Sequence, residues 1–107
     1  MSSTVQESKL VAEVLDLQVD FLSSLAPGET LISSSATVVV SSGIDPNPSA
    51  MLSGASTRLG TTVTQKLTGG LAGVVYLVNV SAGTSLSNII VKQVYLAVLS
   101  DLPFKGP

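Results

Sequence analysis

A glycine-rich segment in the second half of the chain constrains the fold most. Residues 67–76 read Leu-Thr-Gly-Gly-Leu-Ala-Gly-Val-Val-Tyr, so a polar strand end runs into a glycine corner and leaves it as an apolar strand. In β-sandwich domains, a tyrosine placed just after such a turn packs beneath the loop. We therefore predict a structural corner formed by Gly69, Gly70, Gly73 and Tyr76.

The same glycines could also be interpreted as a phosphate-binding loop. Such a loop needs backbone amides that point at the anion, with a helix or a lysine behind them. Here a strand pattern follows the glycines, and no Lys-Ser or Lys-Thr pair closes the loop. The segment therefore favours a structural corner, and we predict no cofactor.

Alternation of apolar and polar residues predicts strands along most of the chain. The clearest case has Leu15, Leu17, Val19 and Phe21 on one face and Asp16, Gln18 and Asp20 on the other. The acidic face of this strand is either solvated or meets a basic partner. Further strand patterns cover residues 31–42, 61–68, 74–80 and 88–100, with a possible short strand at 50–53 and a turn at 54–60.

Three finer expectations concern the register of these strands. Ile32 shares its parity with Ala36, Val38 and Val40 and is expected on the core-facing side. The residues 82–84, Ala-Gly-Thr, are expected to form a hairpin turn. The two rows of the last strand are interrupted at Lys92 and Gln93, which predicts a β-bulge there.

About seven strands and no useful helical period predict an all-β antiparallel sandwich, with a small antiparallel barrel as the second possibility. A chain of 107 residues suits one domain. We place the sandwich at residues 13–100, between an N-terminal arm at 1–12 and a C-terminal tail at 101–107.

Residues 1–12 lack a reliable period. They can be read as a weak helical stripe or as an extended arm that orders only against a partner, and we prefer the arm. The candidate interface consists of apolar residues of this arm and the polar face of the first clear strand: Val5, Leu10, Val11, Asp16, Gln18 and Asp20.

Composition argues against catalysis. The chain has no Cys and no His, which removes thiolate metal sites, the commonest metal ligand and the commonest general base. A serine nucleophile would lack its base. We expect no catalytic residue and no metal site.

The charge pattern and the apolar segments bear on partners. The net charge is −2 with no basic cluster, which does not suit nucleic acid. The longest apolar stretch, 71–78, is far shorter than the ~20 residues of a membrane helix, and no signal peptide is visible. Few charges on a surface rich in Ser and Thr favour assembly into a homo-oligomer.

Two blocks resemble a family of small immunoglobulin-like virion proteins of tailed phages. One is residues 13–16 with the strand to Phe21, followed by Gly-Glu-Thr-Leu-Ile-Ser-Ser-Ser at 28–35; the other is residues 67–73 with Tyr76. The resemblance implies an immunoglobulin-like sandwich and a fibre-to-tail adaptor or head-neck accessory subunit. Its partners would be other phage structural proteins, and it would be made in the host bacterial cytoplasm.

The function that we expect is a non-catalytic structural subunit that bridges neighbouring proteins at the tail or neck. Two alternatives remain open at this point. One is a capsid decoration protein, and the other is a small carbohydrate-binding β-sandwich, which usually presents exposed aromatic residues.

Overall fold

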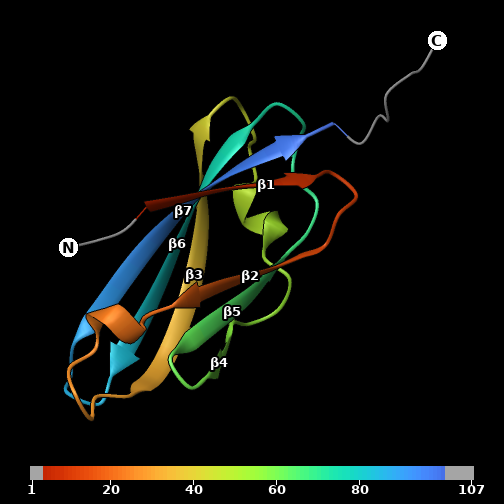
Figure 1. Cartoon of the computed structure of the whole chain (residues 1–107). Helices are drawn as coiled ribbons and strands as arrows, with labels where there is room; N and C mark the ends of the chain where they lie inside the picture. The colour runs from red at the N-terminus through yellow and green to blue at the C-terminus, as the bar shows by residue number, and fades with distance from the viewer. Residues whose placement is uncertain (1–3, 101–107) are drawn as a thin grey trace.

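The chain forms a sandwich of two β-sheets, as the sequence predicts (Figure 1). The computed structural model describes residues 4–100. In this part of the chain there is no α-helix, only two short 3-10 helices. The elements in chain order are β1 (Thr4–Leu10), β2 (Leu15–Asp20), η1 (Leu22–Ser24), β3 (Leu31–Ser42), η2 (Pro48–Met51), β4 (Thr57–Leu59), β5 (Thr62–Leu67), β6 (Val75–Thr84) and β7 (Ile89–Leu99).

The strand order is that of an immunoglobulin-like sandwich. One sheet has four strands in the order β1-β7-β6-β3, and the other has three in the order β2-β5-β4. The second sheet corresponds to strands B, E and D of that fold, and β7-β6-β3 corresponds to G, F and C. All pairings are antiparallel except that of β1 with β7, which is parallel.

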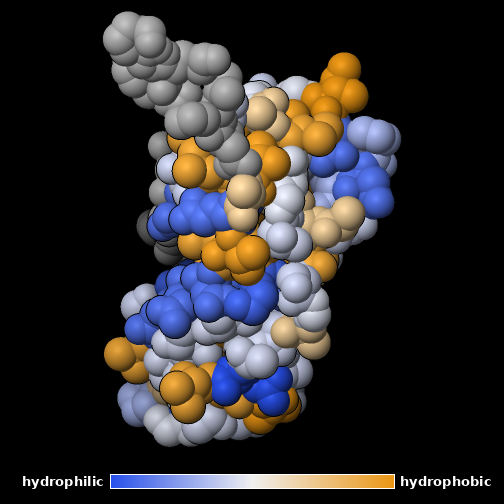
Figure 2. All heavy atoms as spheres, turned by 90° about the vertical axis from the view of Figure 1, so that its right-hand side faces the viewer, coloured by the Kyte–Doolittle hydropathy of each residue, from blue (hydrophilic) through white to orange (hydrophobic). Residues whose placement is uncertain are grey.

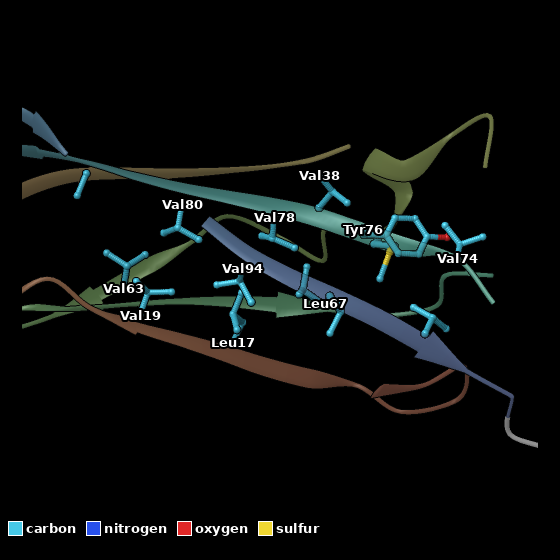
Figure 3. Packing of buried hydrophobic residues seen from close by; sticks show 14 of the residues in the cluster. Leu17, Val19, Val38, Val63, Leu67, Val74, Tyr76, Val78, Val80 and Val94 are labelled. Carbon is cyan, nitrogen blue, oxygen red and sulfur yellow. The ribbon is translucent and has the colours of Figure 1, made fainter. Parts of the chain in front are cut away.

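The core lies between the two sheets and follows the period of two. Every second residue of β6 is buried, including Tyr76, Val78 and Val80. These side chains and Val94 of β7 point toward those of β2 and β5 (Figure 3). The core-facing set of β2 expected from the alternation is present: Leu15 is half-buried, and Leu17, Val19 and Phe21 are buried.

Ile32 does not face the core as expected. Its side chain is 59% exposed, whereas Leu31 packs against the core. The reason is a register shift between Leu31 and Ser33, which exchanges the two faces of the strand at that point. Beyond the shift the expected row holds, with Val38 buried and Ala36 packed against the core.

The predicted bulge in β7 is wrong. The β6–β7 register runs without a shift through Asn79–Gln93 and Val80–Lys92. Lys92 belongs to the core-facing row at the end of the sandwich. Its stem lets Nζ lie over the Phe21 ring, 5.6 Å from the centroid, and donate to the carbonyl of Asp20 at 2.7 Å. A long side chain that reaches past the core thus explains the interrupted pattern.

Three local expectations also need correction. Residues 82–84 belong to β6, and the turn to β7 lies at 85–88, where Ser87 has a φ of 64°. Half of the possible strand at 50–53 is replaced by the end of η2, although Leu52 makes an isolated bridge to Leu67. The expected turn at 54–60 contains the short strand β4.

The N-terminal segment also differs from the expected arm. Residues 4–10 form β1, and each pairs with a residue of β7 in the same chain, from Thr4–Gln93 to Leu10–Leu99. The segment is therefore an edge strand of the chain's own sheet. The sequence pattern is weak because the row of β1 that begins with Val5 continues with the charged residues Glu7 and Lys9 instead of apolar ones. The predicted tail at 101–107 lies outside the described residues.

Candidate interaction surfaces

The glycine corner is built around the hydroxyl group of Tyr76. Tyr76 is completely buried near the start of β6, and its hydroxyl accepts a hydrogen bond from the Leu71 amide at 2.8 Å. It donates another to Asp45 Oδ2 at 2.7 Å. Burial, followed by the hydrogen bond to Asp45, raises the pKa of Tyr76. A tyrosine that bonds back to the loop before its own strand fixes that loop against the sandwich.

The backbone of the corner needs glycine. Gly69, Gly70 and Gly73 have φ values of 69°, 92° and 86°, a region that L-residues rarely adopt. At Gly70 a β-carbon would also lie 2.9 Å from Cγ2 of Val98. The corner is close-packed at Gly70, whereas at Gly69 and Gly73 it is the backbone conformation alone that favours glycine. A strand follows the corner instead of the helix that an anion-binding loop would need.

Lys9 is a part of this corner that the sequence analysis missed. Its side chain is 1% exposed, and Nζ donates to the carbonyls of Leu10 at 2.7 Å, Val11 at 3.2 Å and Gly69 at 2.7 Å. It joins the end of β1 to the loop between β5 and β6. Only the position of Lys9 opposite the buried Val98 reveals this role, and the sequence offers no signal of it.

The candidate interface residues lie on β1, just after it and on β2, and Gln18 and Asp20 of β2 line a groove together with Glu7 of β1. Leu10 is 45% exposed at the end of β1, and Val11 packs partly against the core. Val5 lies within β1, opposite Val94. Asp16, Gln18 and Asp20 follow one another on the outer face of β2.

The outer face of β2 and β5, which we call the charged face, is less acidic than the sequence suggests. Lys66 lies opposite Asp16, and the two side chains form an ion pair at 2.8 Å. Asp20 accepts hydrogen bonds from Thr61 Oγ1 at 2.7 Å and from the Leu22 amide at 2.9 Å. The Thr61 bond, followed by the Leu22 bond, lowers the pKa of Asp20. This face can therefore meet either sign of charge.

One side of the molecule has mixed polarity, the side toward which β2, β5 and β4 lie in Figure 1. Figure 2 views this side and shows hydrophilic residues in a band across the middle, with hydrophobic residues above and below it. This mixture is typical of ordinary protein surface, where both kinds of residue are exposed.

The opposite outer face, formed by β3, β6 and β7, carries no charged residue, and we call it the uncharged face. Three rows cross it from strand to strand: Val39–Leu77–Tyr95, Thr37–Asn79–Gln93 and Ser35–Ser81–Val91. Val39 and Val91 are 45% and 41% exposed, and Ile89 and Leu99 at the strand ends are 77% and 48% exposed.

Side-chain hydrogen bonds across the strands order this face. They join Ser35 to Ser81 at 2.9 Å and Gln93 to Asn79 at 2.9 Å. The apolar residues on both parities of 74–80 predict a central strand that is buried more fully than its neighbours, and this is confirmed: β6 has no exposed residue, whereas β3 and β7 have several. The outward residues of β6, such as Leu77, are half-buried. The sequence therefore indicates the apolar residues of this face. It cannot show that nothing in the described part of the chain covers them.

Residues 4–100 contain no group of three or more His, Cys, Asp or Glu side chains that could hold a metal ion. No helix in this range is long and apolar enough to cross a membrane. The candidate residues lie in the packed glycine corner and on the surfaces described above.

Comparison with known proteins gives a matching family and shows a similar fold among solved structures. The family described as podophage GP4 fiber-tail adaptor protein gp77 matches residues 9–97, which include the end of β1, strands β2 to β6 and most of β7. No curated protein matches.

Among solved structures, the chain is similar to a 2,6-sialyltransferase of Vibrionaceae Photobacterium sp. JT-ISH-224, crystallised with CMP and lactose. The TM-score is 0.57 and the identity 11%, over 94% of this chain and 18% of that chain. This chain thus spans less than a fifth of that structure. At this identity the likeness concerns the fold alone.

Proposed function

Because the chain belongs to the podophage GP4 fiber-tail adaptor protein gp77 family, we propose that it is a non-catalytic structural subunit that bridges neighbouring proteins at the tail or neck of a tailed-phage virion. Its function then depends on surfaces that bind neighbouring proteins, and it uses no cofactor. The family supports the structural tail role, and the bridging is our inference.

The observation that carries the proposal is the contrast between the two outer faces. A bridge must hold two different neighbours at once, and a sandwich presents two faces on opposite sides. Here the uncharged face offers Val39, Leu77 and Val91, whereas the charged face offers Asp16 and Lys66. Faces of different chemistry recognise different partners, because apolar contact drives one association and complementary charge guides the other.

The carbohydrate-binding alternative finds less support. Such a site usually presents aromatic side chains, but of the aromatic residues within 4–100, Phe21 and Tyr76 are completely buried and Tyr95 is half-buried. The decoration alternative gains no specific support from the family, whose description names the fibre and the tail.

The proposal is tested with one substitution on each face, introduced into the phage. Val91→Glu places a charge on the uncharged face, and Gln18→Lys changes the charged face at an exposed position. We expect one variant to be absent from purified particles. We expect the other to be present on particles that lack fibres, because a bridging subunit contacts the tail through one face and the fibre through the other.

The experiment needs two controls, one for folding and one for the effect of any surface substitution. The isolated variants must melt within about 2 °C of the wild type, which separates lost contacts from lost folding. Arg58→Gln on the exposed strand β4 serves as a surface control and should leave both particles and fibres unchanged. Normal particles and fibres with both face variants would contradict the bridging role.

A further inference from the structure

The four sheet edges of the sandwich differ in how they are protected. Edge strands resist pairing with other chains when they are short or carry charged residues. Strand β1 carries Glu7 and Lys9, β2 carries Asp16 and Asp20, and β4 has only three residues. Strand β3 is also an edge, yet its 12 residues contain neither a charge nor a proline.

The backbone of β3 is hydrogen-bonded on one side only. It pairs with β6, and between Ser33 and Val40 this register is continuous. Among residues 4–100, no other backbone group bonds to β3. The segment that crosses to the other sheet lies beside β3 at η2 and β4, and it bonds to the strand through a side chain, Ser56 Oγ, which lies 2.7 Å from Ser34 Oγ. The N–H and C=O groups on the far side of β3 therefore have no backbone partner among residues 4–100.

We propose that β3 pairs with β3 of a second copy of this chain, antiparallel and about a twofold axis, so that the two four-stranded sheets become one. An uncharged strand can face itself, because symmetry brings no like charges together. The outward residues near its middle, Ser35, Thr37 and Val39, are small enough to lie side by side.

The period of two limits the register of this pairing. Core-facing residues must stay on the same side in both copies, so a residue lies opposite itself at the centre. Two such registers suit the middle and the ends of the strand, Thr37 opposite Thr37 and Val38 opposite Val38, and the second brings position 44 opposite position 32. In the first register the two Thr37 side chains are direct neighbours, and in the second they are diagonal neighbours. Both registers therefore bring residue 37 of one copy close to residue 37 of the other.

The ends of β3 also suit this arrangement. Ile32 near its start is 59% exposed, and Ile44 just beyond its end is 85% exposed. Antiparallel pairing brings the end of one strand against the start of the other. The region of Ile44 then meets that of Ile32 at both ends of the interface, which buries apolar surface that a single copy leaves in water.

This inference does not depend on the proposed function, because it concerns the isolated chain. Its test is the molar mass of the full chain in solution, measured by light scattering after gel filtration from 10 μM to 1 mM. We expect the wild type to approach the mass of a dimer as concentration rises. Thr37→Lys and Thr37→Glu should each remain monomeric, since like charges then face one another.

An equimolar mixture of the two variants should recover the dimer mass, because the introduced lysine and glutamate attract across the same axis. Thr57→Lys, at an exposed threonine on the edge strand β4, is the matched control and should dimerise like the wild type. Three results overturn the inference: a monomeric wild type at 1 mM, a dimer that persists in both single variants, and a mixture that stays monomeric while both variants melt like the wild type.

Discussion

At the scale of single residues, the hydroxyl group of Tyr76 links two loops at one end of the sandwich. It joins the Leu71 amide to the Asp45 carboxylate, two groups from different loops, while its ring fills the core. Tyr76→Phe keeps the ring but leaves both partners without this bond. Loss of a buried partner costs about 1–3 kcal/mol, and each kcal/mol lowers Tm by ~4–8 °C in a domain of this size.

We therefore expect Tyr76→Phe to lower Tm by at least ~4 °C in thermal unfolding. Tyr95→Phe is the control, because Tyr95 is half-buried on the uncharged face and its hydroxyl has no hydrogen-bond partner among the described residues. An equal Tm for Tyr76→Phe and the wild type would mean that the loop is held by other contacts.

Glu29 has a corresponding role at the opposite end. Its carboxylate is buried, accepts hydrogen bonds from the Ala26 amide at 2.8 Å and from Asn88 Nδ2 at 3.0 Å, and also bonds to Thr84 Oγ1. The Ala26 bond, followed by those of Thr84 and Asn88, lowers the pKa of Glu29. The folded state therefore binds a proton less readily than the unfolded state.

The resulting stability is present above the unfolded pKa and is lost as pH falls through the folded pKa. We expect Glu29→Gln to lower Tm at pH 7, with a difference from the wild type that shrinks steadily as pH falls below about 4.5. Glu7→Gln, at an exposed position, should melt like the wild type throughout. A Tm difference that does not vary with pH would show that the ionised form of Glu29 has no special role.

At the scale of elements, the sequence predicted strands where burial alternates and missed what depends on other strands. The alternation of β2 and the glycine corner before β6 are local patterns, and both lead to the strands that the structure contains. The inversion at Ile32 depends on a shift between two paired strands, and the burial of Lys9 depends on β7 lying beside β1. Neither the register shift nor the pairing with β7 can be inferred from the residues that flank Ile32 and Lys9 in the sequence.

The strand β1 has a consequence that the arm interpretation would not give. Deleting residues 2–10 would uncover the edge of β7 and remove the three hydrogen bonds of Lys9 Nζ at the corner. We expect Tm to fall by about 10 °C or more, equivalent to roughly 2 kcal/mol, in circular dichroism melts. Deleting residues 2 and 3 alone, which precede the strand, should have little effect. A small fall for the longer deletion would favour the arm.

At the scale of the whole molecule, the two outer faces predict attachments with different responses to salt. Salt screens exposed charges, with a Debye length that falls from ~10 Å at 0.1 M to ~3 Å at 1 M, whereas burial of apolar surface does not weaken in this way. A neighbour bound to the charged face, through residues such as Asp16 and Lys66, should be released by 1 M sodium chloride. A neighbour bound to the uncharged face should remain.

Purified particles incubated at increasing salt should therefore lose only one of the two contacts, either the fibre from the adaptor or the adaptor with its fibre from the tail. Electron microscopy and the protein content of the released fraction distinguish these cases. In the double variant Asp16→Asn, Lys66→Gln, this contact should be weaker at low salt and should depend less on salt, since the charges that salt screens are gone. If both contacts dissociate together, or if the double variant keeps the salt response of the wild type, then charge does not distinguish the two faces and the division of roles between them is wrong.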